Sequence, residues 1–566
     1  MAAPAISSAS LRLGALHQVL LVLLCLFAFV PGIATLPPTD RDESRFVQAT
    51  KQMVASGDYV DIRFQDVPRY KKPAGIYWLQ SAALTLTGQG ADAPIWAYRL
   101  VSVAAATIAV LATARLGAAL FGTGAGLIAG TALAGIVMLL FEGRIAKTDA
   151  TLLATAVIAQ AALARVYLAA RGRIEPSAAA PWIMWAALGA SILIKGPVVP
   201  ALSALTVASL LVLDRDRAWL GRLKAGRGVL LMLLIAAPWL VLITWKSGVE
   251  FWQKSIGEDF ISKIGSGQES HGFPPGYYAA IYVLFLFPFA PLALRGGFKA
   301  LNRMREDPAL LFLVCWYVPY WVMIELIPTK LPHYALPAYP AVLLAMGWAL
   351  TSASAATTEL KRWQLWLWWA TIVGFGLVSV ALAVLSVAAT PYLTGSFSIW
   401  GVVAAILLLA GAWLGSGIGP NTSFRGAILP ATLASAAAFA ILATVVAPGL
   451  RPIWLSPQLA ATFAEVKTCP DSRLVSVGYH EPSLVFLAGT DTLLAGTREA
   501  ALELANNPDC TILMIDDRSM EAFAATMPGG LDSLEELGTV EGFNYSKGTA
   551  RFLRFFRMQP SDPATN

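Results

Sequence analysis

The sequence predicts a polytopic α-helical membrane protein that ends in a small α/β domain. Of the 566 residues, 57% are hydrophobic and 13% are charged, whereas soluble domains carry roughly a quarter charged residues. The mean hydropathy is +0.63, and long apolar runs recur as far as about residue 447. The stretch from about residue 448 onward is polar and contains strand-like runs. The basic residues behind the net charge of +6 are scattered through loops, which argues against nucleic-acid binding.

About thirteen segments are apolar enough to cross a bilayer, which takes roughly 20 residues of helix. The first resembles a signal peptide, but its apolar run is longer than the roughly 7–15 residues of a signal core, so we expect an uncleaved first helix. The fifth and sixth segments are short and could form one kinked helix. The segments are 14–35, 96–120, 122–141, 149–170, 181–194, 197–213, 228–246, 277–294, 308–327, 333–351, 364–388, 397–415 and 425–447.

Basic residues near the segment ends predict the orientation, because Lys and Arg collect in cytoplasmic loops. Loops 214–227 and 295–307 are rich in both, so these loops and the N-terminus are expected inside, and the C-terminal tail outside. Loop 36–95 is the exception, because it is expected outside and yet contains seven basic residues. Long loops can cross regardless of charge, but the cluster also predicts binding of an anionic ligand.

Ionisable residues gather in five of the loops that are expected on the outer side. Charged groups at membrane depth are costly and usually functional, so these loops predict one site at the outer leaflet. The first loop also predicts two helices along the membrane surface. One has Phe46, Ala49, Met53 and Val54 on its apolar face and ends at Gly57, and the other covers KPAGIYWLQSAALTL. The five loops are 36–95, 142–150, 195–197, 257–278 and 328–337.

An outer-leaflet site with several cations suits a phosphate or pyrophosphate carried by a lipid. Arg binds phosphate through two parallel hydrogen bonds, and Lys acts as a point charge. A carboxylate such as Asp42 could accept a proton from an acceptor hydroxyl or orient it. A sugar on a lipid phosphate already has a good leaving group, so the protein would need to hold the donor, stabilise the departing phosphate and aim the acceptor. The candidate phosphate-binding residues are Arg45, Lys72, Lys147, Lys195 and Lys330.

Four motifs carry a resemblance to a known family: DESRF, YKKPAGIYW, GRIAKTD and TKLPHYALPAYP. In this order they resemble bacterial GT-C glycosyltransferases, above all the lipid A 4-amino-4-deoxy-L-arabinose transferases, within the wider protein O-mannosyltransferase-like group (glycosyltransferase family 39). The resemblance covers roughly residues 14–350. It implies a GT-C fold with about thirteen membrane helices over residues 1–450 and a periplasmic α/β domain over residues 451–566.

The resemblance also implies roles for single residues. Asp42 matches an acidic residue held essential in such enzymes, Glu43 completes a shared Asp-Glu pair, and Asp149 matches the carboxylate of the TD pair. Lys72 matches a lysine thought to contact the donor phosphate. Position 71 is Lys where aminoarabinose transferases usually have an acidic residue, which argues against metal binding and aminoarabinose specificity. An acidic sugar such as a uronic acid would suit the extra cation. The expected substrate contacts are Lys71, His271, His333 and Tyr334.

Each assignment has a structural alternative. The carboxylates could cap the helices that they begin. The Lys71–Lys72 pair could anchor anionic lipid, and Lys195 and Lys330 could extend to the membrane interface.

The tail is expected to contain strands at RLVSVGY, SLVFLAG and CTILMID, a closing strand at TARFLRFFRM, and helices at 457–467 and 497–506. No nucleotide-binding loop or catalytic triad is visible in it. Cys469 and Cys510 could pair if the tail lies in an oxidising compartment, whereas Cys25 and Cys315 are expected to be buried apolar residues.

The sequence therefore predicts an inverting glycosyltransferase of the bacterial inner membrane. It would move a sugar from undecaprenyl phosphate, or another polyprenyl phosphate, to lipid A or another cell-envelope glycan on the periplasmic side. No metal ligands are assigned, and a divalent metal stays an open cofactor. The alternatives are a protein O-mannosyltransferase-like enzyme and a transporter or flippase of a lipid-linked sugar. A transporter should place charges near the midplane, often with repeated halves, and the sequence predicts neither.

Overall fold

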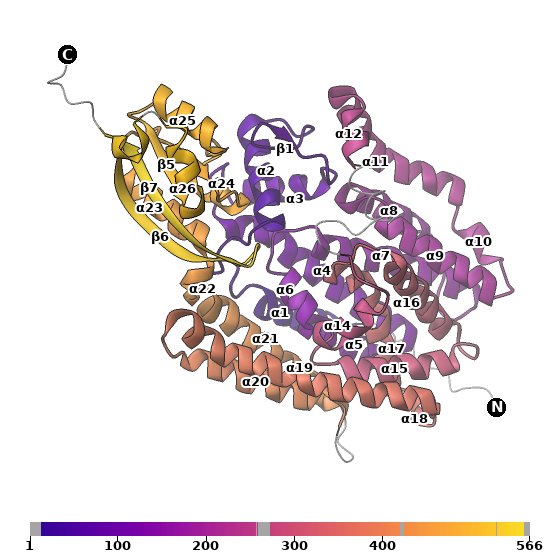
Figure 1. Ribbon diagram of the computed structural model, residues 1–566. Coiled ribbons are helices and arrows are strands. Elements are labelled where there is room, and N and C mark those ends of the chain that lie inside the picture. The colour runs from indigo at the N-terminus through magenta and orange to yellow at the C-terminus, as the bar shows by residue number, and fades with distance from the viewer. Residues whose placement is uncertain (1–12, 256, 258–271, 419–423, 528, 560–566) are drawn as a thin grey trace, which may run out of the picture.

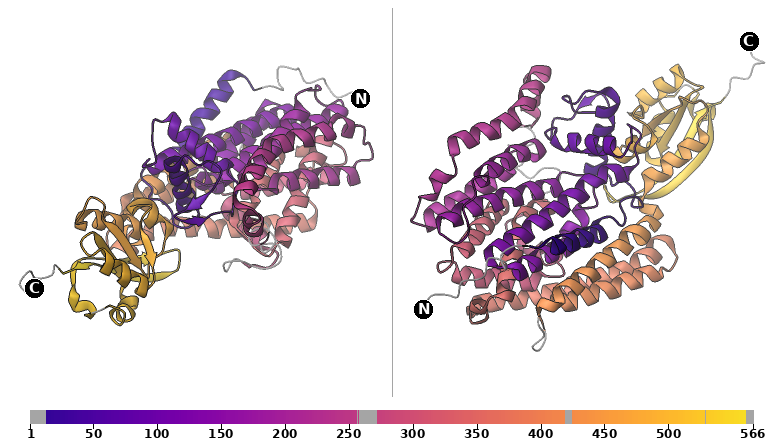
Figure 2. Two further views of the ribbon diagram at one scale, coloured as in Figure 1. Left: turned by 90° about the horizontal axis from the view of Figure 1, so that it is seen from above. Right: turned by 180° about the vertical axis from the view of Figure 1, so that it is seen from behind.

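A helical body makes up most of the chain, and a smaller domain with a β-sheet lies at one end of it. The computed structural model describes residues 13–255, 257, 272–418, 424–527 and 529–559. The sheet domain lies beside α2 (Asp42–Ser56) and α3 (Gly75–Leu86) when the molecule is seen from the front (Figure 1) and from behind (Figure 2). The first long loop and the C-terminal domain are therefore neighbours at the same end of the helical body.

Every segment that was predicted to cross the membrane contains helix. Seven helices of the described residues are long and apolar enough to span a bilayer, and five further apolar helices are shorter. The structure breaks segment 122–141 into two helices and segment 277–294 into two more, so the number of thirteen spans stays a prediction. The helices of the body are α1 (Ala15–Phe29), α4 (Ile95–Phe121), α5 (Thr123–Gly135), α6 (Val137–Glu142), α7 (Asp149–Ala170), α8 (Ala180–Lys195), α9 (Val198–Leu213), α10 (Trp219–Arg222), α11 (Ala225–Ser247), α12 (Glu250–Trp252), α14 (Tyr277–Phe285), α15 (Ala290–Arg303), α16 (Pro308–Leu326), η3 (Pro332–Ala338), α17 (Tyr339–Thr351), α18 (Ala353–Ala356), α19 (Arg362–Thr394), α20 (Ile399–Gly415), α21 (Phe424–Ile441), η4 (Leu442–Val446), α22 (Ala447–Gly449) and η5 (Arg451–Ile453).

Small residues let the helices of the body approach closely. A Cβ atom added at Gly126 of α5 would lie 2.2 Å from the Ala114 carbonyl oxygen of α4. One added at Gly347 of α17 would lie 2.4 Å from the Ala125 carbonyl oxygen of α5. Such glycine contacts are typical of helix packing in membranes, where there is no hydrophobic driving force between helices.

The first long loop forms the two predicted helices and a short hairpin. Helix α2 buries Phe46, Ala49 and Met53 and ends at Gly57, whose φ of 69° suits a glycine. The strands β1 (Arg63–Phe64) and β2 (Val67–Pro68) connect α2 to α3. Helix α3 begins against the backbone of α8, because a Cβ atom at Gly75 would lie 2.7 Å from the Leu193 carbonyl oxygen. This packing places the motif YKKPAGIYW beside the end of α8.

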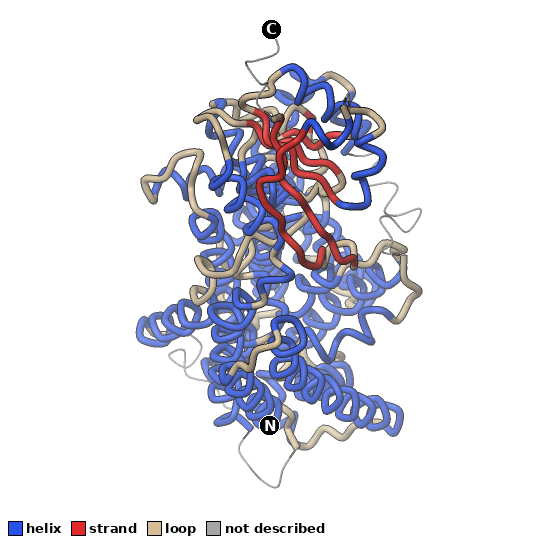
Figure 3. Tube along the Cα trace, turned by 60° about the vertical axis from the view of Figure 1, so that its left-hand side comes forward, coloured by secondary structure: helices blue, strands red, loops and turns tan. Residues whose placement is uncertain are grey.

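The C-terminal domain is built on a five-stranded sheet in the order β4-β3-β5-β7-β6 (Figure 3). Strands β4, β3 and β5 are parallel, and β7 and β6 join them as an antiparallel hairpin. The elements are α23 (Leu455–Val466), β3 (Arg473–Val477), α24 (Pro482–Ala488), β4 (Leu493–Ala495), α25 (Thr497–Asn506), β5 (Thr511–Asp516), α26 (Asp517–Ala524), η6 (Gly530–Ser533), β6 (Leu534–Asn544) and β7 (Thr549–Met558).

One predicted strand of this domain is wrong. The run SLVFLAG lies in helix α24, which has Pro482 in its first turn, a position that favours a helix start. A short apolar run cannot distinguish a buried strand from a buried helix. The strands at 473–477, 511–516 and 549–558 and the two predicted helices are confirmed, whereas β4 and β6 were missed.

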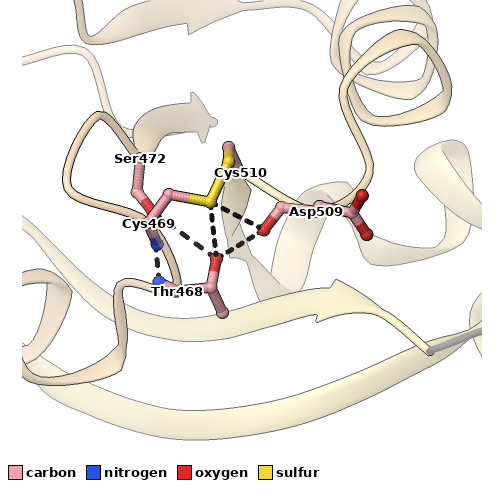
Figure 4. Close-up of a disulfide and its surroundings, with 5 residues drawn as sticks. All are labelled: Thr468, Cys469, Ser472, Asp509 and Cys510. Atoms are coloured by element: carbon pink, nitrogen blue, oxygen red, sulfur yellow. Dashed lines mark hydrogen bonds between the residues drawn. A yellow bond between two sulfur atoms is a disulfide. The ribbon is translucent and has the colours of Figure 1, made fainter.

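A disulfide joins Cys469 and Cys510, whose Cα atoms are 5.4 Å apart. It links the segments that lead into β3 and β5, where Thr468 also donates a 2.5 Å hydrogen bond to the Asp509 carbonyl oxygen (Figure 4). The pairing that the sequence left open is therefore formed, and Cys25 and Cys315 are buried free thiols, as expected.

Replacing Cys469 by Ser is expected to destabilise the C-terminal domain by about 3–4 kcal/mol, because the disulfide closes a long loop, with a sequence separation of 41 residues. The measurement is urea-dependent protease cleavage of this domain in the full-length protein. A reductant should reproduce the shift in the parent protein and have no effect on the variant. Equal urea midpoints for the variant and the parent would contradict the prediction.

Candidate functional site

A cavity of about 570 Å³ lies where the first long loop, loop 142–150, the end of α8 and the C-terminal domain meet. Four of the five predicted outer loops contribute to its lining, namely 36–95, 142–150, 195–197 and 328–337. Most of the remaining loop, 257–278, including the predicted substrate contact His271, lies outside the described residues. Four of these loops thus meet at one cavity, as predicted, and their location on the outer side of the membrane stays a prediction.

Basic side chains outnumber acidic ones in this cavity. Among the residues that the structure describes, seven basic and four acidic residues line it, and one of the acids is neutralised by an arginine behind the wall. An anion is therefore the ligand that the cavity favours. The basic residues are Arg41, Arg45, Arg69, Lys71, Lys72, Lys147 and Lys195, and the acidic ones are Asp40, Asp42, Glu43 and Asp149.

Asp42 is the first residue of α2, and its side chain is accessible within the cavity. Burial alone would favour the neutral acid, but the positive charges of Lys147 and Arg69 outweigh it and hold the pKa of Asp42 below its usual value. The carboxylate is therefore ionised at neutral pH. A group with so low a pKa is a weak base but a good hydrogen-bond acceptor, so it suits orienting a hydroxyl or amine.

Glu43 lies directly behind Asp42 and is completely buried. Its Oε1 atom accepts hydrogen bonds from Arg99 Nε at 2.7 Å and from the Ala146 amide at 2.8 Å. Its Oε2 atom accepts from Arg99 at 2.8 Å and from the amide and hydroxyl of Thr39. These partners hold the pKa of Glu43 below its usual value in spite of burial.

The arrangement corrects the prediction that Glu43 is catalytic. Both carboxylate oxygens of Glu43 accept hydrogen bonds from the protein, so neither is left to bind a substrate. Instead Glu43 connects α2 to α4 through Arg99 and to loop 142–150 through Ala146, the residue before Lys147. It is a positioning residue for Asp42 and Lys147.

A compact charged cluster, most of whose members line the cavity, lies near Asp42. Lys195 donates a 2.5 Å hydrogen bond to Asp149 Oδ1, and Lys147 lies 3.1 Å from Glu142 Oε1 and 3.6 Å from Asp149 Oδ2. His333 lies between the two carboxylates, 3.9 Å from Glu142 and 3.7 Å from Asp149. The burial of Lys147 disfavours its charge, but Glu142, Asp149 and Asp42 together raise its pKa above the usual value.

Three residues of this cluster have the chemistry of metal ligands. Ligand atoms of Glu142, Asp149 and His333 lie within 4.8 Å of one another. The Lys147 and Lys195 ammonium groups, however, already bind Glu142 Oε1 and Asp149 Oδ1, whereas the buried Glu142 Oε2 accepts no hydrogen bond from the residues that the structure describes. A divalent ion would have to displace or face two fixed positive charges, so these residues fit a lysine-balanced cluster rather than a metal centre.

The remaining predicted residues divide into two groups. Arg45, Lys71, Lys72 and Tyr334 line the cavity, where the Lys195 ammonium lies 5.4 Å from the centre of the Tyr334 ring. Lys330 does not line it. Its ammonium is buried and donates to the carbonyl oxygens of Ile324, Glu325 and Ile327. Lys330 therefore caps the C-terminal end of α16, which corrects its predicted role in phosphate binding.

Several residues of the site were missed from the sequence. Arg99 was detectable, because a lone arginine near the start of an apolar helix signals a buried partner. Glu142 was visible in EGRIAKTDA but resembled an ordinary loop residue, and Arg69 was counted only as one of many loop cations. Nothing in the sequence indicated that Trp454 and Tyr545, far along the chain, line the cavity.

The C-terminal domain contacts the cavity through Asp40 and Arg41. The Tyr545 hydroxyl accepts a 2.7 Å hydrogen bond from the Asp40 amide, and Arg41 donates at 2.6 Å to the Ser546 carbonyl oxygen. Ser483 donates to the Asp40 carboxylate. The site is therefore shared between the helical body and the C-terminal domain.

The fold and the site together define the class of protein. The chain superposes on the crystal structure of ArnT from Cupriavidus metallidurans bound to undecaprenyl phosphate, with a TM-score of 0.73, 20% identity and coverage of 96% of this chain and 98% of that one. It also matches the archaeal oligosaccharyltransferase AglB from Archaeoglobus fulgidus, with a TM-score of 0.52, 13% identity and coverage of 97% and 74%. The chain has the GT-C fold of membrane glycosyltransferases.

Sequence comparisons narrow the resemblance to the aminoarabinose transferases. The chain is 25% identical over 360 residues to the undecaprenyl phosphate-α-4-amino-4-deoxy-L-arabinose arabinosyl transferase of Pectobacterium atrosepticum, and the match covers 61% of this chain and 60% of that protein. It is 24% identical over 394 residues to the protein of the same name in Pseudomonas paraeruginosa, with coverage of 67% and 66%. Residues 71–242 match the family described as dolichyl-phosphate-mannose-protein mannosyltransferase. The resemblance inferred from the four motifs is confirmed, and the matches span about three fifths to two thirds of the relatives' length.

Replacing Glu43 by Gln is expected to lower the stability of the protein by about 3–5 kcal/mol, because Arg99 would stay buried without a charged partner. Thermal unfolding of the detergent-solubilised protein measures the loss. Adding Arg99→Met should recover part of it, because the unpaired charge is then removed. Asp66→Asn, on the exposed surface of the same loop, is the control. An unchanged melting temperature for Glu43→Gln would contradict the structural role.

Asp40 is expected to make stability depend on pH. Burial, aided by the negative charge of Glu481, raises the pKa of Asp40 from 3.8 to about 6 in spite of the hydrogen bond from Ser483. Between these two pKa values the folded protein keeps Asp40 protonated, whereas the unfolded chain has already released this proton. The stability of the folded state therefore falls as the pH rises through about 6. The melting temperature should be higher at about pH 5 than at about pH 7, and Asp40→Asn should flatten this difference. A profile unchanged by Asp40→Asn would rule Asp40 out as its source.

Proposed function

We propose that the protein is a glycosyltransferase that moves a sugar from undecaprenyl phosphate to lipid A or another cell-envelope glycan. The observation that carries this proposal is the cavity itself. It sets an ionised, accessible carboxylate, Asp42, against lysines and arginines from three separate outer loops. Such a site fits a reaction between two substrates, an acceptor that carries a nucleophile and a donor that carries a lipid phosphate. The similarity to aminoarabinose transferases supports the same reaction class.

In the proposed reaction, an oxygen or nitrogen of the acceptor attacks the anomeric carbon of the sugar from the side opposite the phosphate. The bond between that carbon and the phosphate oxygen breaks, its electron pair leaves with undecaprenyl phosphate, and the configuration inverts. Arg45, Lys72, Lys147 and Lys195 would stabilise the departing phosphate charge. Asp42 would orient the nucleophile through a hydrogen bond. The acceptor proton would end on the released phosphate, whose second pKa of about 6 makes it a better base than Asp42.

The excess of cations bears on the sugar of the donor. Lys71 lines the cavity together with Lys72, Arg41 and Arg69, which is more positive charge than one phosphate needs. We propose that the sugar is acidic, such as a uronic acid. The mass added to the acceptor would decide this directly, because a uronic acid and aminoarabinose differ in mass.

The proposed site faces the periplasm of a multi-pass inner-membrane protein. The disulfide at one end of the C-terminal domain supports this side, because such bonds persist in oxidising compartments. The apolar helices support insertion in a membrane. The transporter alternative is less well supported, because the charged cavity lies among outer loops and helix ends, as an enzyme at the membrane surface requires.

Asp42→Asn is expected to lower sugar transfer at least about a hundredfold while binding of undecaprenyl phosphate persists, because the nucleophile loses its orienting anion. Transfer is measured by mass spectrometry of lipid A and envelope glycans from a deletion strain that carries each variant. Binding is measured on the purified protein with undecaprenyl phosphate as the probe.

Asp66→Asn removes a carboxylate from the same loop but outside the cavity, so it should leave transfer unchanged. Full transfer by Asp42→Asn would end the catalytic assignment. A sugar missing from secreted or membrane proteins of the deletion strain, with unchanged lipid A and glycans, would favour the alternative with a protein acceptor.

A further inference from the structure

The backbone of Arg41, next to Asp42, has a conformation that is rare for a residue with a side chain. Its φ is 65° and its ψ is −105°, outside the regions that L-residues ordinarily adopt. Glycine adopts positive φ values without this cost. Such a conformation persists only when the surrounding structure holds it, and it is often found at functional sites.

The contacts that hold this conformation come from both directions along the chain. On the far side, Glu43 is fixed by Arg99. On the near side, the Asp40 amide donates to the Tyr545 hydroxyl at 2.7 Å, and the Arg41 side chain donates to the Ser546 carbonyl oxygen at 2.6 Å. The near-side contacts therefore come from a hairpin that lies about 500 residues later in the sequence.

The tip of that hairpin, residues 544–548 between β6 and β7, is itself well fixed. Asn544 and Ser546 both donate to Glu481 Oε1, at 2.8 Å and 2.6 Å. Gly548 supplies the positive φ of the turn. The ring of Tyr545 packs edge to face against Trp454, with ring centres 5.7 Å apart. Because the tip is held in this way, its contacts can fix the backbone of Asp40 and Arg41 in one conformation.

We propose that this hairpin tip is a brace that holds Arg41 in its strained conformation and thereby sets the direction of the Asp42 carboxylate. Tyr545 and the turn at Ser546 are positioning residues of the site. The C-terminal domain thus completes the active site through the backbone of the first outer loop. The proposal rests on the proposed function of Asp42, and it assigns the C-terminal domain a role in turnover.

The first test compares two variants at position 41. Arg41→Gly and Arg41→Ala both remove the guanidinium group, but glycine alone accepts the observed φ and ψ without strain. We expect Arg41→Gly to retain about tenfold more sugar transfer than Arg41→Ala. Equal transfer by the two variants would overturn the brace.

The second test removes the brace while keeping its ring. Tyr545→Phe leaves the Asp40 amide without its acceptor, so transfer should fall about tenfold while affinity for undecaprenyl phosphate is unchanged. Amide hydrogen exchange of the peptide 38–46 in the full-length protein should become faster. Lys547→Ala, an exposed side chain on the same turn, is the matched control and should change neither quantity.

Combining Tyr545→Phe with Arg41→Gly distinguishes a brace on Arg41 from a direct contact between Tyr545 and the substrate. In the Arg41→Gly background the strain is gone, so Tyr545→Phe should cost much less than in the parent protein. An equal cost in both backgrounds, with unchanged hydrogen exchange, would overturn the proposal. The outcome is also distinct from failure of the proposed function, because that failure is full transfer by Asp42→Asn whatever happens at Tyr545.

Discussion

The buried ion pair between Glu43 and Arg99 is the interaction on which the rest of the site depends. Both side chains are completely buried, and an isolated charge in such a place would be very unfavourable. All five N–H groups of Arg99 find acceptors, two on Glu43 and the others on the carbonyl oxygens of Ile33, Leu36 and Pro37. The pair therefore fixes the segment that follows α1, the start of α2 and loop 142–150 relative to one another. A buried pair adds little net stability over apolar residues, so what it supplies here is a fixed position for the neighbouring Asp42.

The second constraint is the charge balance of the cavity wall. Glu142 and Asp149 hold Lys147 and Lys195 in place through ion pairs of 3.1 Å and 2.5 Å. Ammonium groups held by carboxylates at fixed distances are preorganised for an anion, because they need no rearrangement when charge develops on a leaving group. The same argument explains why a metal is a poor fit, since the lysines already supply the positive charge that a metal ion would bring.

The sequence was sufficient to predict the helices of the body and most of the loops that line the cavity. The predictions that were wrong or missing failed for different reasons. Apolar segments and loop charges predicted the helices and the convergence of loops, because hydrophobic length and buried charge are local signals. Lys330 was misassigned because a lysine in an outer-loop motif gives the same pattern whether it binds phosphate or caps a helix. The run SLVFLAG was misassigned because a short, mostly apolar run fits a strand or a buried helix equally well. Tyr545 was beyond prediction, because its contact with Asp40 depends on how two domains dock.

That docking has a consequence for how the site is assembled. The strained backbone of Arg41 gives Asp42 a fixed direction only while both neighbours of Arg41 are held, and the contacts on the two sides differ in kind. Arg99 is part of the helical body and is in place whenever the body is folded. The hairpin contacts depend on a separate domain, whose interface with the loop includes a buried carboxyl at Asp40. The geometry of Asp42 is thus conditional on the second domain, so the site becomes fully organised only after the C-terminal domain has folded and docked.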